Sequence, residues 1–296
     1  MNILITGATG FIGRELIKKF DKKELTILSR TYIEEYKNIN HPLEDFINKK
    51  CINSKFDVAI HLAGLAHGTF SDSILTSNFK STMALAEQLA INGMKRFIFL
   101  SSIGVNGGVT SGTPFSEQSL PKPHTKYSLC KYNIEIALQD LAKELNFELV
   151  IIRSPLVYGI NAPGNFGRVF NLISKGIPLP FGMIKNSKSF ISVSNLSDFI
   201  KLAVKHPNVS NELFLVSDDN PISTKDMVLD IWKAKGIKSF LLPIPSFLLR
   251  LVLFLIGQTP MSVQLIDDLE IDNGKAKKLT GWTPKENFFE YFKNSL

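Results

Sequence analysis

The sequence has little cysteine and no hydrophobic run long enough to span a membrane. Its two cysteines, Cys51 and Cys130, are too few for a disulfide framework and lack metal-site spacing, so we predict no metal. The most apolar stretch, LLPIPSFLLRLVLFLIG at 241–257, contains Arg250 and is bounded by prolines and a glycine. A transmembrane helix needs about 20 apolar residues. This stretch therefore predicts a core or interface helix, or a peripheral membrane contact, and no transmembrane span.

Two further features are absent. The N-terminus, MNILITGATG, lacks the basic segment and the cleavage site of a signal peptide, so we expect a cytoplasmic protein. The net charge is +7, but Lys and Arg are scattered and form no stripe with aromatic residues, which argues against a nucleic-acid partner. A mildly basic chain also suits an anionic small molecule such as a nucleotide sugar.

Short apolar runs alternate with helix-period segments in the first half of the chain. The runs are continuous and rich in β-branched residues, Leu and Phe, as strands covered on both faces are. They lie at 2–6, 25–29, 57–62, 96–101 and 147–153, with amphipathic segments at 11–20, 41–50, 73–92 and 126–146 between them. This alternation predicts an α/β fold with a Rossmann-type, doubly wound parallel sheet.

The pattern loosens after residue 153. Pro and Gly interrupt 155–182, and the segments that follow predict strands in FISVS and LFLVS and helices at 166–175, 195–205 and 224–235. We expect residues 1–155 to form an NAD(P)-binding Rossmann domain. Residues 156–296 are expected to form mainly a smaller, interleaved substrate-binding lobe, with some elements returning to the Rossmann sheet.

A glycine-rich loop follows the first predicted strand. In NILITGATGFIGRELIKKF, Gly7, Gly10 and Gly13 come directly after the apolar run and begin a helix. Glycines at this spacing allow a tight turn and a close approach of the backbone to a pyrophosphate, which then lies at the helix N-terminus. The position of the motif in an α/β chain predicts dinucleotide binding.

The end of the second predicted strand bears on which dinucleotide binds. NAD-binding proteins usually have Asp or Glu there to accept the ribose hydroxyls. Here the run is LTILSRTY, with Ser29 and Arg30 and no acid. Arg30, with Arg14 just after the glycine loop, could bind a 2′-phosphate through charge-assisted hydrogen bonds. We therefore expect NADP(H) to be preferred, with NAD(H) possible.

Tyr127 and Lys131 lie four residues apart at the start of the helix expected at 126–146, so they share one helical face. A Lys ammonium beside a phenol favours the phenolate and lowers the Tyr pKa from its usual value of about 10. The spacing thus suggests a proton donor and acceptor that works near neutral pH. Cys130 lies within this motif and is not assigned as a nucleophile.

These motifs, taken in order, resemble the extended short-chain dehydrogenase/reductase family, in its branch of nucleotide-sugar epimerases, dehydratases and 4-keto reductases. The resemblance covers nearly the whole chain. Its motifs are TGATGFIG, DVAIHLAG, FLSSIGVNG, YSLCK, VIIRSPLVYG and GWTP.

The resemblance implies roles for individual residues. Tyr127 would donate or accept the proton, Lys131 would hold the nicotinamide ribose, and Ser102, rather than its neighbour Ser101, would orient the substrate oxygen. The implied substrate contacts are Ser102, Asn165 and Lys188. The implied cofactor contacts are Gly7, Gly10, Phe11, Ile12, Gly13, Arg30, Leu62, Ala63, Gly64, Tyr127, Lys131 and Pro155.

Some positions depart from the family pattern. Leu156 replaces an Asn common in UDP-glucose epimerases, and Lys188 replaces an Arg that contacts the substrate diphosphate. Ile103 and Gly104 follow Ser102. In the family's 4,6-dehydratases an acidic pair follows the catalytic Ser or Thr, so a dehydratase is disfavoured. The stretches SSIGVNG, GIPLPFG and NSKSFISVSNLSD are similar to those of bacterial surface-polysaccharide enzymes, including enzymes of O-antigen synthesis.

Three functions follow as hypotheses. The first is NADPH-dependent reduction of a dTDP- or UDP-linked 4-keto-6-deoxy sugar. The alternative is an NAD-dependent nucleotide-sugar 4-epimerase, of the UDP-glucose or UDP-N-acetylhexosamine type. A non-enzymatic redox sensor on the same fold is disfavoured because the Tyr–Lys pair is present. The family also implies a homodimer, formed through 73–92 and 126–146, with Leu85, Leu89, Ile134 and Leu138 on the apolar faces expected to make contact.

Overall fold

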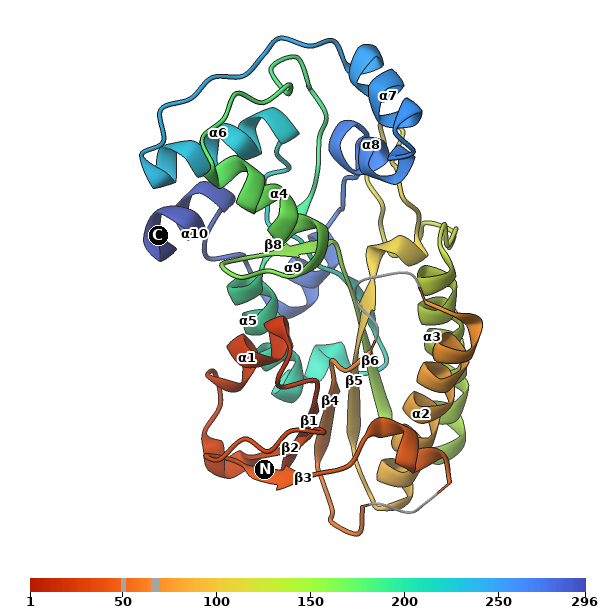
Figure 1. The fold of residues 1–296 in the computed structure, drawn as a ribbon. Coiled ribbons are helices and arrows are strands. Elements are labelled where there is room, and N and C mark those ends of the chain that lie inside the picture. The colour runs from red at the N-terminus through yellow and green to blue at the C-terminus, as the bar shows by residue number, and fades with distance from the viewer. Residues whose placement is uncertain (49–51, 65–69) are drawn as a thin grey trace.

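Seven parallel strands form the central sheet of the protein (Figure 1). The computed structural model describes residues 1–48, 52–64 and 70–296. The strand order is β3-β2-β1-β4-β5-β6-β9, in which the chain reverses its direction of growth between β1 and β4. The strands are β1 (Ile3–Thr6), β2 (Leu25–Leu28), β3 (Lys37–Ile39), β4 (Val58–His61), β5 (Arg96–Ser102), β6 (Glu148–Ser154) and β9 (Leu213–Leu215). The predicted Rossmann fold is confirmed.

Helices cover both faces of this sheet. On one face α2 (Asp72–Ile91) and α3 (Lys126–Leu145) lie side by side, and on the other are α1 (Phe11–Ile17), α5 (Val193–Lys205) and α9 (Gly274–Thr280) (Figure 1). Each face has its own hydrophobic core, and both cores include residues of the strands, which explains why the strand sequences are continuously apolar. Short 3₁₀ segments complete this part: η1 (Lys22–Glu24), η2 (Leu43–Ile47), η3 (Ile103–Val105) and η4 (Pro207–Val209).

A second lobe lies above the carboxyl ends of the strands (Figure 1). Its elements are the two-stranded parallel sheet of β7 (Leu156–Tyr158) and β8 (Phe190–Ser192), with α4 (Gly164–Ser174), α6 (Thr224–Lys235), α7 (Ser246–Leu255), α8 (Thr259–Ile266) and α10 (Phe288–Ser295). A third hydrophobic core, rich in aromatic residues, holds this lobe together. Only Pro155 separates β6 from β7, so the chain passes directly from one lobe to the other.

The chain returns to the Rossmann sheet after entering the second lobe. Strand β9 pairs with the edge of β6, α5 packs against α1, and Trp282 belongs to the core beneath α1 and α5. The strands expected in FISVS and LFLVS are β8 and β9. The helix expected at 41–50 is reduced, within the described residues, to the 3₁₀ segment η2.

The apolar residues expected at a dimer contact lie elsewhere. Leu85, Leu89, Ile134 and Leu138 are fully buried in the core between α2, α3 and the sheet of the same subunit. Their helical faces point inward because the sheet needs an apolar cover on this side. The expectation that these four residues contact a second subunit is therefore wrong.

Candidate functional site

The glycine loop lies at the point where the strand order reverses. Gly7 follows β1 with φ +75°, and a Cβ at this position would lie 2.7 Å from the backbone nitrogen of Ala63, which follows β4. A Cβ at Gly13 would overlap the carbonyl oxygen of Gly7. Any larger residue would therefore fill the crevice or push the loop away from it. Ligands of open parallel sheets bind in this crevice, so the loop fits a dinucleotide pyrophosphate.

A buried polar chain fixes the opposite side of the crevice. The hydroxyl of Thr6 accepts a hydrogen bond from the Ala63 N–H at 3.1 Å and lies 2.9 Å from Nδ1 of His61. The other ring nitrogen of His61 is 3.1 Å from the Thr82 hydroxyl on α2. Burial lowers the pKa of His61 to about 3, so its ring is neutral and structural. The backbone at 62–64 is thus held at the edge of the crevice.

The other cofactor positions contribute backbone or shape. The side chain of Phe11 packs against the core of the second lobe, and that of Ile12 packs against the core beneath α1. Both side chains therefore have a packing role in addition to any contact with a ligand. Pro155 is buried between β6 and β7. These residues shape the crevice, and their predicted contacts with a cofactor stay predictions.

The two arginines expected near an adenosine ribose are both exposed. Arg14 donates from Nε to the carbonyl oxygen of Thr9 at 2.8 Å, which ties it to the glycine loop. Ser29 forms a local turn with Thr31 through its hydroxyl, so Arg30 extends from the end of β2 with no acid beside it in sequence. This end of the crevice therefore has the residues to receive an anionic group.

Tyr127 and Lys131 lie on the first turns of α3, whose N-terminus has a capping box of Thr125 and Ser128. Lys131 is buried, and its Nζ donates to the carbonyl oxygen of Leu100 at 2.9 Å. The same atom is 6.0 Å from the centre of the Tyr127 ring. Both side chains therefore face the carboxyl end of β5, beneath the crevice.

The expected lowering of the Tyr127 pKa is wrong for the structure as it stands. Burial raises the pKa of Tyr127 to about 12, with a smaller contribution from the Cys130 thiol. Burial also lowers the pKa of Lys131 to about 8. The physical reason is that the Lys131 ammonium is turned to the Leu100 carbonyl and does not reach the phenol. Near neutral pH the phenol is protonated and fit to donate a proton.

Ser102 and Ser101 have different environments at the end of β5. The Ser101 hydroxyl is buried and donates to the Glu135 carboxylate, so it is taken up by a structural contact. The Ser102 hydroxyl accepts from the N–H of Gly104 at 3.1 Å and is partly exposed at a cavity. A Cβ at Gly104 would lie 3.4 Å from Ser102 Oγ and 3.3 Å from Ser128 Cβ, so the space between β5 and α3 is narrow here.

A buried ion pair that was not predicted lies behind these residues. Glu135 lies one turn beyond Lys131 and accepts from Arg153 of β6, at 3.1 Å and 3.2 Å from Nε. Arg153 also donates to the Asn106 side chain at 2.9 Å. The i, i+4 series of Tyr127, Lys131 and Glu135 was the available signal. This network fixes α3 against β5 and β6 and so positions the Tyr–Lys pair.

A cavity of about 300 Å³ lies between β5, β8 and α8. Ser102 and Lys188 both line it, although they are 86 residues apart in the chain. Leu156 and His124 also line it, and His124 was not predicted. Pro260, Val263 and Gln264 of α8 complete the wall on the side of the second lobe. The two predicted substrate contacts, Ser102 and Lys188, thus face one space.

Lys188 is the unusual residue of this cavity. Its side chain is only 7% exposed, and among the described residues its ammonium has no hydrogen-bond or ion-pair partner. Burial lowers the pKa of Lys188 to about 8, opposed by the nearby carboxylates of Asp267 and Asp268. The residue is buried, but its ammonium opens on the cavity and so is accessible to a ligand. The cavity is therefore suited to an anion.

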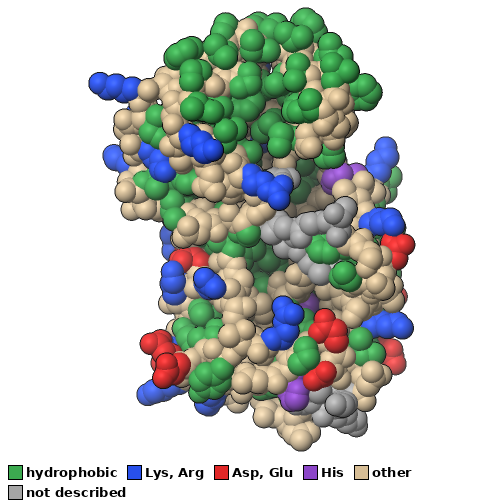
Figure 2. Space-filling view, viewed as in Figure 1, with side chains coloured by type: hydrophobic (Ala, Val, Ile, Leu, Met, Phe, Trp, Pro, Cys, Tyr) green, Lys and Arg blue, Asp and Glu red, His purple; other side chains and the backbone are tan. Residues whose placement is uncertain are grey.

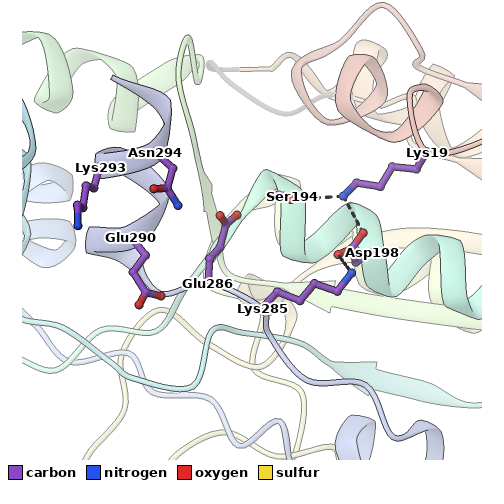
Figure 3. Close-up of a pocket in the computed structure, with 8 residues that line it drawn as sticks. All are labelled: Lys19, Ser194, Asp198, Lys285, Glu286, Glu290, Lys293 and Asn294. Atoms are coloured by element: carbon purple, nitrogen blue, oxygen red, sulfur yellow. Dashed lines mark hydrogen bonds and ion pairs between the residues drawn. The ribbon is translucent and has the colours of Figure 1, made fainter.

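Asn165 lies within α4, but its side chain is outside the described residues, and its role in substrate binding stays a prediction. A second hollow, of about 600 Å³, lies among α1, α5 and α10 (Figure 3). There Asp198 is held by Lys19 at 2.6 Å and by Lys285 at 2.8 Å. None of the predicted site residues lines it, and its central carboxylate is already neutralised by these two lysines.

The comparison with known families agrees with this site. Residues 3–216, more than two thirds of the chain, match the family described as the NAD dependent epimerase/dehydratase family. The chain belongs to this family. The family identity and the enzyme class predicted from the sequence are thereby confirmed.

Individual members of the epimerase/dehydratase family are similar over most of their length. The chain is 35% identical over 309 aligned residues to a UDP-glucose 4-epimerase of Vibrio cholerae, which covers 99% of this chain and 94% of that protein. It is 25% identical to a dTDP-4-dehydro-6-deoxyglucose reductase of Escherichia coli, over 76% of this chain and 79% of that one. The solved UDP-glucose 4-epimerase of Thermotoga maritima, with UDP-glucose, has a TM-score of 0.79 at 21% identity, over 100% and 97% of the two chains.

Proposed function

We propose that the protein is a 4-epimerase of a nucleoside diphosphate sugar. The observation that carries the proposal is the ammonium of Lys188, which has no protein partner among the described residues and opens on the same cavity as Ser102. A diphosphate beside Lys188 would neutralise it and direct the sugar toward the carboxyl end of β5. The sequence identity of 35% to a UDP-glucose 4-epimerase, across nearly the whole chain, favours epimerisation over the other reactions of the family.

The roles of the residues follow from their chemistry. A nicotinamide dinucleotide, when bound, supplies the hydride acceptor and donor. The glycine loop and the backbone at 62–64 would hold it at the strand reversal. In epimerisation Tyr127 would accept the proton of the sugar hydroxyl as its carbon is oxidised and return it as the carbon is reduced. In the structure as it stands the phenol is protonated, so the first of these transfers needs the phenolate. Ser102 can hydrogen-bond the same oxygen. Lys131 would supply positive charge beneath the ribose.

A second candidate is NADPH-dependent reduction of a 4-keto-6-deoxy sugar nucleotide. It is favoured because Ser29 and Arg30 stand at the end of β2, where an NAD-binding protein would have an acid. The sequence identity of 25% to a dTDP-4-dehydro-6-deoxyglucose reductase also favours it. Incubation with UDP-glucose and no added reductant separates the two candidates. An epimerase forms UDP-galactose, whereas a reductase consumes NADPH only with the 4-keto sugar. Mass spectrometry of the copurified dinucleotide identifies the cofactor.

Replacing Lys188 with methionine is expected to weaken UDP binding by about 10- to 150-fold, because a charge-assisted hydrogen bond contributes roughly 1.5–3 kcal/mol. Isothermal titration with UDP measures the loss. The conservative variant Lys188→Arg keeps the charge and should keep most of the affinity. Since the pKa of Lys188 is about 8, wild-type affinity should fall above pH 8. The Arg variant should show no such fall. Equal affinities for wild type and Lys188→Met would remove the diphosphate from this cavity.

Replacing Arg30 with aspartate is expected to shift cofactor preference toward NADH. If Arg30 binds a 2′-phosphate, the new carboxylate repels it and accepts ribose hydroxyls instead. The expected loss of NADPH affinity is about 10- to 150-fold. Fluorescence titrations of both cofactors into wild type and Arg30→Asp provide the measurement. Tighter NADH than NADPH binding by the wild type would contradict an NADP preference and favour the epimerase.

Other expectations remain proposals. They are a cytoplasmic location, a role in bacterial surface-polysaccharide synthesis, and a homodimer. Among the described residues, no helix is long and apolar enough to cross a membrane. If α2 and α3 pair with a second copy, Leu129 and Ile136 are the exposed apolar residues of α3 that could take part, in place of the buried residues expected first.

A further inference from the structure

Helix α7 presents large apolar side chains to solvent. Leu249 and Leu253 are buried and attach one narrow side of the helix to the second lobe. The apolar side chains that remain outside, called the α7 patch, have exposures of 39–72% and are Phe247, Leu248, Leu251, Val252, Phe254, Leu255 and Ile256. In Figure 2 apolar side chains form a continuous area over the upper lobe.

This arrangement is the reverse of an ordinary surface helix, which buries its apolar face and shows a polar one. Single exposed apolar residues are common, but a cluster on one helix marks an interaction surface. Arg250 does not interrupt the cluster, because it is paired with Asp267 of the adjacent segment. The helix has ten residues and therefore can lie on a membrane but not cross it.

Positive charge prevails beside the α7 patch, where Asp267 is already paired with Arg250. No Asp or Glu occurs in 149–197 or in 231–266, the segments that form α4, α7, α8 and their connections. Exposed lysines, including Lys175, Lys185 and Lys238, lie in or beside these segments. Figure 2 shows Lys and Arg around the apolar area and acidic side chains only farther down the molecule. An apolar helix with a cationic surround fits an anionic lipid surface.

A second copy of the chain fits the patch less well. In a two-fold dimer the same patch meets itself, so the surrounding lysines of the two subunits would approach each other, and Asp267 beside the patch is already paired with Arg250. A bilayer with anionic headgroups offers both an apolar interior and opposite charge. We propose that the α7 patch docks the protein onto the surface of an anionic lipid bilayer. This inference goes beyond the proposed reaction and does not depend on it.

Docking would also set the position of the substrate cavity. Helix α8 packs against α7 and supplies Pro260 and Val263 to the cavity wall. With α7 in the headgroup region, α8 and the adjoining cavity wall lie close to the membrane. The site would then receive sugar diphosphates at the lipid surface as well as from solution.

Sedimentation of the full-length protein with lipid vesicles tests the proposal. Vesicles of phosphatidylethanolamine with phosphatidylglycerol should bind the protein, and vesicles of phosphatidylcholine should bind it at least about tenfold less. The double variant Phe247→Asp/Phe254→Asp should lose about tenfold or more of its vesicle partition, because two exposed rings no longer enter the apolar region. The control is Ile91→Asp, on the far lobe and equally exposed, which should bind as wild type.

The variants need two further measurements. Thermal unfolding and activity with soluble UDP-glucose should match the wild type, since the substituted side chains are exposed and lie outside the cavity. Failure of the proposed reaction would therefore leave the vesicle result intact. Equal binding to neutral and anionic vesicles would overturn the proposal. It would also be overturned if the protein bound no vesicles and light scattering showed a dimer that the double variant dissociates.

Discussion

Replacement of Tyr127 by phenylalanine is expected to lower kcat by about 10²- to 10⁴-fold, because only the hydroxyl that transfers the proton is lost. The ring remains beside Lys131, so the fold and the dinucleotide affinity should not change. Steady-state kinetics with UDP-glucose measure kcat, and cofactor titration measures the affinity. A variant with near wild-type kcat would remove Tyr127 from the mechanism.

The matched control for this prediction is Tyr132→Phe. Tyr132 lies on the same helix, and among the described residues no hydrogen bond is formed by its hydroxyl. It should retain wild-type kcat. Ser102→Ala is expected to lower kcat/KM by less than Tyr127→Phe does. It removes a hydrogen bond that orients the substrate oxygen but leaves the Tyr127 hydroxyl in place.

Replacement of Arg153 by methionine is expected to destabilise the protein by about 3–5 kcal/mol, because it leaves the buried Glu135 carboxylate without its partner. Ser101 alone would then remain to hydrogen-bond this carboxylate. Urea unfolding followed by circular dichroism measures the free energy of unfolding. Because this network positions α3, activity should also fall in the variant protein that remains folded.

A double variant distinguishes the ion pair from the packing around it. Arg153→Met combined with Glu135→Leu removes both charges and should recover much of the lost stability, since an apolar pair of similar volume often replaces a buried ion pair. Asp140→Ala, which breaks an exposed pair with Lys143 on the same helix, should change the stability little. An equal loss in Arg153→Met and in the double variant would assign the effect to volume and not to charge.

The strands that the sequence predicted well are those covered on both faces. Residues 2–6 and 96–101 are continuous apolar runs because both cores of the Rossmann part include their side chains. Strand β3 was missed because it is a short edge strand of three residues, KNI, that is half-exposed. Helices α8, α9 and α10 were also missed, since their short apolar stripes become recognisable only against the second lobe and the sheet that they cover.

The site was predicted where residue type alone implies chemistry, as at the glycine loop and Tyr127. The isolation of Lys188 depends on the packing of α8 over β8, which no local pattern encodes. The direction of the Tyr127 pKa was mispredicted because spacing places Lys131 nearby but does not say which acceptor its ammonium chooses. The buried faces of α2 and α3 were misassigned to a dimer because apolar periodicity does not reveal which neighbour covers it.

The return of the chain to the first sheet has a consequence for folding on the ribosome. The core beneath α1 and α5 includes Phe199, Phe214 and Trp282, so it cannot close until residue 282 has been synthesised. At about 5–20 residues per second, the strands completed by residue 154 wait on the order of ten seconds for Trp282. During that time β6 has a free edge, since β9 has not yet paired with it. The nascent protein therefore exposes a strand edge and apolar surface, of the kind that chaperones bind, until Trp282 is in place.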